Sequence, residues 1–468
     1  MKLKFIGATE TVTGSMHLIE TENNFSILLD CGLYQGLGQE TDILNRHLNV
    51  NPSAINVVLL SHAHIDHSGN LPLLVKQGFL GFIYCTPPTR KVVELLLFDS
   101  ANIHEFDIEY INKERESLNQ KPLEPLYTYH DVERCLKHFK TIPYNQEFQL
   151  NDQMSFTFTD VGHILGSAAV NLKFNNGAGK LTRLTYTGDI GKYNDIILKN
   201  PQPFPQADYI ICESTYGDRL HNNSPDSDLQ LLNIIRKTCI EKKGKLIIPA
   251  FSLGRTQELV FILNKLKNKN MLPNINIYVD SPLSAGITNI MREHINCFNE
   301  SFNQYLSKDA DPFGFENLKY IIDKEDSKAL NNQKEPCIII AASGMMDGGR
   351  IKHHLIHYIS DSKHTILIVG YCTTNSLGGQ IKNGKKNVKI LDEFYDVKAE
   401  IATIDSYSAH ADYSEIIHFL SCQNKKKVKT IFLVHGDTNA KIIFKEKLIK
   451  EGFLDIVIPN KNKLIQLS

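Results

Sequence analysis

The stretch Ser61-His62-Ala63-His64-Ile65-Asp66-His67 governs how the rest of the sequence is interpreted, because it places three imidazoles and a carboxylate within six positions. The apolar run 56–60 before it predicts a short buried strand, and the run 71–76 after it predicts a helix with Ser68 as its N-cap. We therefore expect the stretch on a strand-to-helix loop. Imidazole and carboxylate are typical zinc ligands. The spacing offers His62 and His64 to one metal ion, and Asp66 and His67 to a second.

Length and composition are those of a globular protein with more than one domain. The chain has 468 residues, 42% of them hydrophobic and 22% charged, which is more than one small core usually holds. The net charge of −1 gives no overall field for nucleic acid, so any basic groove must be local. Nine cysteines without a C-x-x-C pair indicate reduced thiols. With neither an N-terminal apolar segment nor a run of membrane length, we expect a cytoplasmic protein without a membrane partner.

Other histidines and carboxylates also follow predicted strands, where the active sites of layered α/β proteins form. They are Asp30 after 25–29, His163 after 154–159, Asp189 after 184–187, Glu213 after 208–212 and His435 after 430–434. Taken singly, each is as well explained as a turn or core residue. Taken together they predict a two-metal site: His163 completes the first group, His435 completes the second, and Asp189 is the carboxylate that both ions share.

The order of the predicted elements indicates an α/β protein with an inserted domain. Strands and helices alternate in a doubly wound manner from about residue 245 to 369, whereas both flanking regions have strands that end in ligand-type residues. We expect 1–207 and 371–468 to form one domain, interrupted by a second domain at 208–370.

These motifs together resemble a known family. The order Asp30, His62-x-His64-x-Asp66-His67, His163, Asp189 looks like the four motifs of the metallo-β-lactamase fold. Glu213-Ser214-Thr215-Tyr216-Gly217, Ser408-Ala409-His410-Ala411-Asp412 and Val434-His435-Gly436-Asp437 look like the three added motifs of β-CASP nucleic-acid hydrolases. The similarity is closest to prokaryotic relatives of the endonuclease subunit that cleaves eukaryotic mRNA 3′ ends.

The resemblance implies a metallo-β-lactamase αββα sandwich with an inserted doubly wound β-CASP domain, and two Zn²⁺ ions. It implies hydrolysis of single-stranded RNA by a metal-bound hydroxide that leaves 5′-phosphate and 3′-OH ends, endonucleolytic or also 5′→3′ exonucleolytic. His435 indicates RNA, because the DNA-repair branch typically has valine there. The catalytic residues would be Asp66, Glu213 and His410, with His410 as proton donor, while Asp30 would hold the His62 loop by hydrogen bonds.

Several points stay open in the sequence. Glycine-flanked segments of the inserted domain give candidate RNA-binding residues, namely Ser252, Arg255, Ser343, Gly344 and Arg350. A small-molecule metallo-hydrolase, a DNA-acting nuclease and a non-catalytic partner subunit remain alternatives. The sequence is also compatible with either a single chain or a homodimer.

Overall fold

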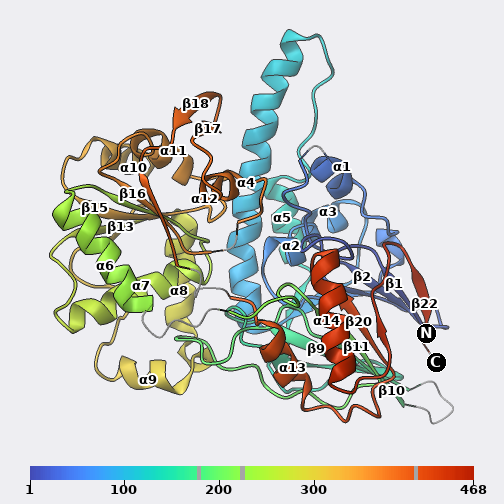
Figure 1. The fold of residues 1–468 in the computed structure, drawn as a ribbon. Helices are drawn as coiled ribbons and strands as arrows, with labels where there is room; N and C mark the ends of the chain where they lie inside the picture. Colours follow the sequence, from blue (N-terminus) through green and yellow to red (C-terminus); the bar gives the residue numbers. More distant parts are fainter. Residues whose placement is uncertain (39, 176–180, 222–226, 371, 405–408, 468) are drawn as a thin grey trace. The chain divides into compact units, whose positions relative to one another are not determined.

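The computed structural model of the protein describes residues 1–38, 40–175, 181–221, 227–370, 372–404 and 409–467. The chain divides into two compact units (Figure 1). Unit 1 comprises Met1–Leu220 and His410–Ser468, and unit 2 comprises His221–Ala409. Unit 2 is therefore an insertion in the sequence of unit 1, as the order of the motifs predicted.

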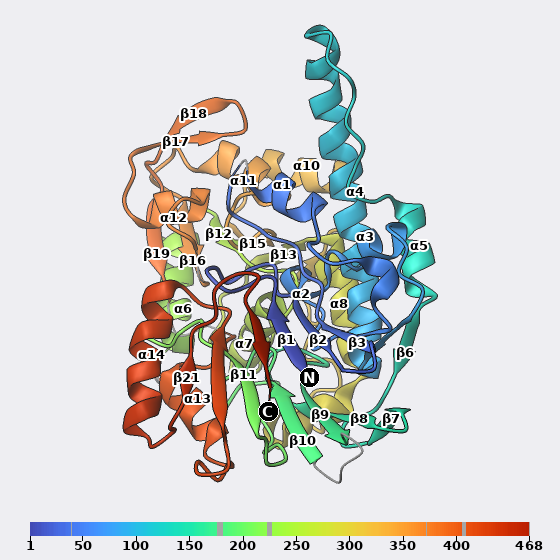
Figure 2. The ribbon, with the colours of Figure 1, turned by 90° about the vertical axis from the view of Figure 1, so that its right-hand side faces the viewer.

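Unit 1 is built on two sheets of seven strands each. The first has the order β22 (Leu464–Gln466), β1 (Lys2–Phe5), β2 (His17–Glu20), β3 (Ser26–Leu29), β4 (Val57–Leu59), β5 (Phe82–Cys85) and β6 (Phe139–Thr141). The second has the order β21 (Ile456–Val457), β20 (Thr430–Val434), β11 (Tyr209–Glu213), β10 (Leu181–Tyr186), β9 (Ala168–Asn175), β8 (Met154–Asp160) and β7 (Phe148–Asn151). Because β22 pairs antiparallel with β1, the two chain ends lie side by side (Figure 2).

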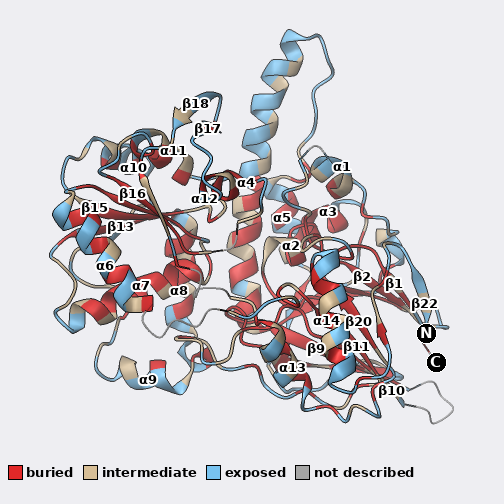
Figure 3. Cartoon of the chain, viewed as in Figure 1, coloured by how far each residue is buried: buried red, intermediate tan, exposed pale blue. Residues whose placement is uncertain are grey.

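The two sheets face each other across an apolar core and have helices on their outer sides. Phe5 and Leu29 from the first sheet meet Phe156 and Phe432 from the second, all fully or nearly fully buried. Helices α13 (Tyr413–Leu420) and α14 (Thr438–Lys450) cover the outer face of the second sheet. Beside the first sheet stand α1 (Glu40–Arg46), α2 (Ile65–Ser68), α3 (Leu71–Lys76), α4 (Pro87–Ser117) and α5 (Tyr129–Leu136). This is the predicted αββα sandwich, whose central strands such as β3, β4 and β11 are buried along their whole length, whereas the edge strands β7 and β22 are largely exposed or half-buried (Figure 3).

Unit 2 has a six-stranded sheet in which all neighbouring strands pair in parallel. Its order is β14 (Leu318–Tyr320), β13 (Asn276–Asp280), β15 (Cys337–Ala341), β12 (Leu246–Pro249), β16 (Thr365–Ile368) and β19 (Glu400–Thr403). The connecting helices are α6 (Ser227–Ile235), α7 (Arg255–Asn268), α8 (Pro282–Glu293), α9 (Glu300–Leu306), α10 (Lys324–Asn332), α11 (Ile351–Tyr358) and α12 (Leu377–Lys382). A hairpin of β17 (Asn387–Ile390) and β18 (Glu393–Asp396) completes the unit, whose doubly wound character agrees with the prediction.

The boundaries of the two units differ from the predicted divisions at 207/208 and 370/371. Strand β11 pairs with β10 and β20, so residues 208–220 stay with unit 1. Strand β19 pairs with β16, so residues 371–409 stay with unit 2. The sequence pattern at 208–212 predicted β11 but did not indicate its partners, because pairing in a parallel sheet joins residues far apart in sequence.

None of the described helices is both long and apolar enough to cross a membrane, the 31-residue α4 included. All nine cysteines are free thiols, seven of them buried.

Candidate metal centre

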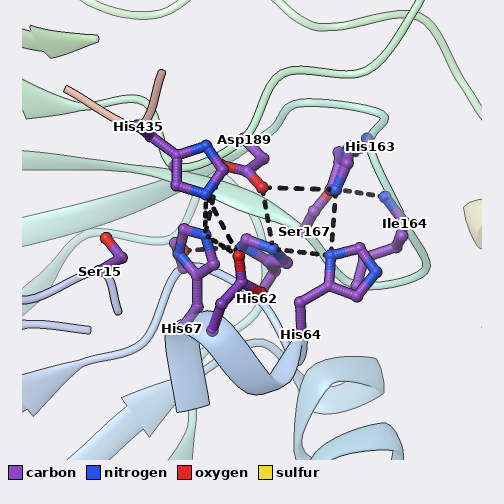
Figure 4. A network of polar contacts seen from close by, with 12 residues as sticks. Ser15, His62, His64, His67, His163, Ile164, Ser167, Asp189 and His435 are labelled. Carbon is purple, nitrogen blue, oxygen red and sulfur yellow. Dashed lines mark hydrogen bonds and ion pairs between the residues drawn. The ribbon is translucent and has the colours of Figure 1, made fainter. Parts of the chain in front are cut away.

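The predicted metal ligands all lie in unit 1, where strands of both sheets bring them to one place (Figure 4). His62 and His64 follow β4, whereas Asp66 and His67 lie on the short helix α2 rather than on a loop. The prediction that Ser68 caps the next helix was wrong. Ser68 is the last residue of α2, and its Oγ donates to the Ala63 and His64 carbonyls, so that it braces the turn that carries the ligands.

The first group consists of three imidazoles and one oxygen of Asp189. His64 Nδ1 lies 3.1 Å from His62 Nε2 and 3.2 Å from His163 Nε2. Asp189 Oδ2 lies 3.5 Å from His62 Nε2 and 3.6 Å from His163 Nε2. Burial lowers the pKa of His62 well below its usual range, and it lowers the pKa of His64 to about 4. Both imidazoles are therefore neutral near pH 7, as metal ligands must be.

The second group consists of His67, His435 and Asp66. His67 Nε2 lies 3.2 Å from His435 Nε2, and Asp66 Oδ2 lies 3.3 Å from His435 Nε2 and 3.9 Å from His67 Nε2. Burial disfavours a charged His67, but the carboxylates of Asp189 and Asp66 outweigh burial and raise its pKa well above the usual range. Binding a cation at this group must therefore displace a proton from His67.

Asp189 connects the two groups. Its Oδ2 faces the first group, while its Oδ1 lies 3.3 Å from His67 Nε2 and 3.4 Å from His435 Nδ1 in the second. The side chain is 2% exposed, yet no donor within the described part of the chain is aligned to hydrogen-bond Oδ1. Leaving a buried polar atom unsatisfied costs about 1–3 kcal/mol or more. A divalent cation would remove this cost, so the residues fit a metal.

The backbone around the site is held in conformations that few side chains allow. Gly188, next to Asp189, has φ +56°, and a Cβ there would lie 2.8 Å from Ser61 Cβ. Asp30 and His435 also have positive φ, of 58° and 51°, which is unfavourable for non-glycine residues. Such conformations persist only where surrounding contacts enforce them, and they concentrate at functional sites.

Asp30 lies behind the ligands and contacts them through hydrogen bonds, as predicted for a residue that holds the His62 loop. Its Oδ2 is 2.6 Å from His67 Nδ1 and accepts from Ser61 Oγ at 2.7 Å. Its Oδ1 accepts from the Ser61 backbone N–H at 2.7 Å. Because the Nδ1 of His67 is hydrogen-bonded to Asp30, the Nε2 is the nitrogen that faces the centre.

Sequence reasoning missed several hydroxyl groups around the site. Tyr186 OH donates to Asp30 Oδ2, Ser61 Oγ lies 3.0 Å from His62 Nδ1, and Thr215 Oγ1 lies 3.1 Å from His435 Nδ1. Their positions in the sequence were the one available clue: Ser61 is next to His62, and Thr215 lies in the same motif as Glu213. Serine, threonine and tyrosine are too common at strand ends to be singled out without coordinates.

His410 pairs with Glu213 beside the two groups: its Nδ1 lies 3.9 Å from Asp189 Oδ2, and the centroid of its ring lies 4.5 Å from that of His163. Ser408 of its motif lies outside the described residues. His410 Nδ1 lies 3.3 Å and 3.4 Å from the two carboxylate oxygens of the fully buried Glu213. Burial by itself lowers the pKa of His410, but Glu213, assisted by Asp189 and Asp66, outweighs burial and raises the pKa to about 9. The Ile190 backbone N–H donates to Glu213 and fixes its carboxylate. The imidazole is 21% exposed, so it can reach a substrate.

The five candidate RNA-binding residues lie in unit 2, and two of them have other partners. Arg255 is 6% exposed and pairs with Glu258. Arg350 donates to Asp280 Oδ1 at 2.6 Å and to the carbonyl of Ile322 at 2.7 Å. Both guanidinium groups are therefore engaged by partners within the protein.

The remaining three candidates follow the ends of two neighbouring strands. Ser252 follows β12, and its hydroxyl lies 3.2 Å from Ser281 Oγ. Ser343 and Gly344 follow β15, which pairs with β12. A Cβ on Gly344 would lie 2.8 Å from the ring of Phe251, so this loop packs closely against its neighbour.

Comparison with known proteins agrees with this architecture. Residues 18–201 match the metallo-β-lactamase superfamily domain, residues 256–381 the β-CASP domain, and residues 395–459 the Zn-dependent metallo-hydrolase RNA specificity domain. A crystal structure of a protein of unknown function from Enterococcus faecalis V583 has the same fold, with a TM-score of 0.54 and 11% identity over 100% of this chain and 99% of that one.

Three curated relatives are similar over nearly the whole chain. Ribonuclease TTHA0252 of Thermus thermophilus is 32% identical over 97% of this chain and 96% of its own length. An RNase J-like protein of Methanocaldococcus jannaschii is 29% identical over 99% of both chains. Transcription termination factor FttA of Methanosarcina mazei is 29% identical over 94% of this chain and 67% of its own length.

The sandwich, the inserted parallel-sheet unit and the clustered ligands define a metal-dependent hydrolase of the metallo-β-lactamase fold. Within that class, the chain belongs to the β-CASP family of ribonucleases. The predicted family and fold are thereby confirmed.

Proposed function

We propose that the protein hydrolyses phosphodiester bonds of single-stranded RNA in the cytoplasm with two Zn²⁺ ions, cutting endonucleolytically and leaving 5′-phosphate and 3′-OH ends. The observation that supports this most strongly is the buried Asp189, whose two oxygens face two separate ligand groups. A carboxylate shared in this way is typical of two-metal hydrolases that act on phosphate esters. The name of the matched RNA specificity domain and the ribonuclease names of two relatives support RNA as the substrate.

In this proposal His62, His64 and His163 would hold one ion, Asp66, His67 and His435 would hold the other, and Asp189 would be a ligand shared by both. Ions bound there would polarise the scissile phosphate and lower the pKa of a water molecule toward neutrality. Water, rather than the RNA 2′-OH, would then supply the new oxygen on phosphorus. This accounts for the proposed 5′-phosphate end.

His410 gives a proton to the 3′-oxygen as the bond from phosphorus to that oxygen breaks. The Glu213 carboxylate keeps its imidazole protonated near pH 7, because it raises the pKa to about 9. Glu213 also fixes the orientation of the ring, and its own position is set by the Ile190 N–H. A positioned acid of this kind typically contributes about 10²–10⁴-fold in rate.

We further propose that RNA contacts unit 2 at Ser252, Ser343 and Gly344, at the ends of the paired strands β12 and β15. Gly344 itself has no side chain, which favours close approach of a phosphate group to its backbone. Arg255 and Arg350 take a different role in this proposal, because their guanidinium groups hold Glu258 and Asp280.

The test uses circular single-stranded RNA with a single internal label, incubated with the purified protein and zinc. Linear products with 5′-phosphate and 3′-OH ends are expected, because a circle offers no end to an exonuclease. A matched circle with one 2′-deoxy residue at the scissile position should be cut equally well. Products with 2′,3′-cyclic phosphate would contradict the role of water. Cleavage of single-stranded DNA in preference to RNA, or hydrolysis of small esters alone, would contradict the substrate class.

A further inference from the structure

Tyr186 joins the two halves of the candidate metal centre. It ends β10, the strand that leads to Asp189 in the second sheet. Its hydroxyl donates at 2.7 Å to Asp30 Oδ2, which follows β3 in the first sheet. The centre itself is assembled from both sheets, because His62 and His67 come from the first, and Asp189 comes from the second. The bond between Tyr186 and Asp30 thus fixes the strand ends of one sheet against those of the other.

Asp30 Oδ2 receives more donors than a carboxylate oxygen usually has. Tyr186 OH, Ser61 Oγ and His67 Nδ1 all lie within 2.7 Å of it. Asp30 is fully buried, so its charge depends on these donors for stabilisation. Removing the Tyr186 hydroxyl would leave Ser61 and His67 to satisfy this oxygen, and the carboxylate would be free to move toward them.

The hydroxyl of Tyr186 is itself held in place. Ser15 Oγ lies 2.9 Å from it, and the edge of the His17 ring meets the tyrosine ring with centroids 5.5 Å apart. The ring is 1% exposed within the core between the sheets. These contacts leave the hydroxyl little freedom, so it presents a fixed donor to Asp30.

We infer that Tyr186, held by Ser15, is a positioning residue that sets the orientation of His67 through Asp30 and thereby the affinity of the Asp66–His67–His435 group for its metal ion. The inference rests on the proposed metal site. The chain of contacts runs from Ser15 through Tyr186 and Asp30 to His67 Nδ1, and the opposite nitrogen of His67 faces Asp189 at 3.3 Å. Loss of a hydrogen bond behind a metal-binding histidine typically lowers metal affinity by about 10–100-fold.

The experiment titrates zinc into the metal-free full-length protein against a competing chelator and resolves the two binding steps. Tyr186→Phe keeps the ring and removes only the hydroxyl. We expect one zinc to bind as in the parent and the other about 10-fold or more weakly. Ser15→Ala should weaken the same step by less, because Ser15 touches Asp30 only through Tyr186. Cobalt spectra should report an altered environment for the same ion alone.

Tyr209→Phe is the matched control, because Tyr209 is 4% exposed in the same core but begins β11, at the opposite end from Glu213. It should leave both binding steps unchanged. If both zinc-binding steps have the same affinity in Tyr186→Phe and Ser15→Ala as in the parent, the inference is overturned. Equal weakening of both steps in the variants would also overturn it. A parent that binds no zinc would instead refute the proposed function, so the two failures are distinguishable. If Tyr186→Phe does not fold, the zinc affinities of Ser15→Ala alone test the inference.

Discussion

Two buried aspartates, Asp189 in unit 1 and Asp280 in unit 2, occupy similar positions just after or at the end of a strand but have opposite surroundings. Asp280 ends β13 and is satisfied by the protein: Arg350 donates at 2.6 Å, His354 Nε2 lies at 2.7 Å, and Ser327 Oγ also donates. Asp189 is buried to the same degree, but its Oδ1 accepts no hydrogen bond from the described residues.

This difference indicates that the Asp280 carboxylate stabilises the fold, whereas the Asp189 carboxylate is suited to bind a metal ion. Burial alone would raise the pKa of Asp280, but hydrogen bonds from His354, Ser327 and Arg350 outweigh it and lower the pKa. At Asp189 the compensating groups are imidazoles, which are themselves metal ligands. A buried charge whose partners are all potential metal ligands indicates a metal site. One with an arginine partner indicates a structural ion pair.

Removal of metal should have the largest effect on activity, and it should change the region around Asp189 but not the region around Asp280. Treatment with a strong chelator is expected to abolish RNA cleavage, and added zinc should restore it. Amide hydrogen exchange should then speed up in residues 61–67 and 161–167, because the ligands there lose their common partner. Exchange in 276–280 and 350–358 around Asp280 should stay the same. Equal acceleration in both regions would show that the two clusters do not differ in this way.

His410→Ala should slow cleavage by about 10²–10⁴-fold while zinc content and RNA affinity stay unchanged, because in this proposal both ligand groups are complete without His410, whose Nδ1 pairs with Glu213 and lies 3.9 Å from Asp189 Oδ2. The defect should shrink on RNA with a 3′-bridging phosphorothiolate, since a thiolate leaves without a proton. Glu213→Gln should show a weaker form of this rescue. A His410→Ala defect that is equal for sulfur and oxygen leaving groups would rule out the role as proton donor.

Asp280→Ala should lower the free energy of unfolding by about 3–5 kcal/mol, because it leaves Arg350 and His354 without their buried partner. The zinc content of the folded protein should not change. The matched control is Asp311→Ala, which breaks a pair with Arg292 whose side chains are 35% and 47% exposed. That loss should be at most about 1 kcal/mol in denaturant titrations. Similar losses for the two variants would mean that burial does not distinguish these pairs.

Raising the pH should cause the smallest of these changes in the rate of cleavage. The pKa of His410 is raised to about 9, so its imidazole is protonated below that pH and loses its proton above it. A reaction that needs the acid form therefore slows about tenfold per pH unit on the alkaline side. Bound cations lower this pKa, so the alkaline limb should lie at or below pH 9. Proton NMR of His410 checks the value without metal, and Glu213→Gln should lower it.

The sequence allowed much of the site to be predicted because metal ligands are rare residue types at recognisable places. His62, His64, Asp66 and His67 occur within six positions, and the strand 430–434 was predicted at the observed bounds. Hydrophobic runs determine such strands locally. The structure brings the histidines and carboxylates that follow these runs into two adjoining groups, as the joint pattern predicted.

What could not be predicted depends on contacts between distant segments. Tyr186 and Asp30 are 156 residues apart, and no local pattern marks a tyrosine as the donor to a particular carboxylate. Arg350 looked like a phosphate contact because it follows two glycines, but Asp280, 70 residues earlier, engages it. The same reason explains why the two units divide at other positions than predicted, since the partners of β11 and β19 are set by pairing across the chain.

The most direct test of the account is elemental analysis of two variants purified side by side, Asp189→Ala and Asp280→Ala. Parent and Asp280→Ala should each carry close to two zinc ions per folded chain. Asp189→Ala should lose most of both ions, because its carboxylate serves both groups. Undiminished zinc in Asp189→Ala would contradict the shared-carboxylate site on which the proposed function depends.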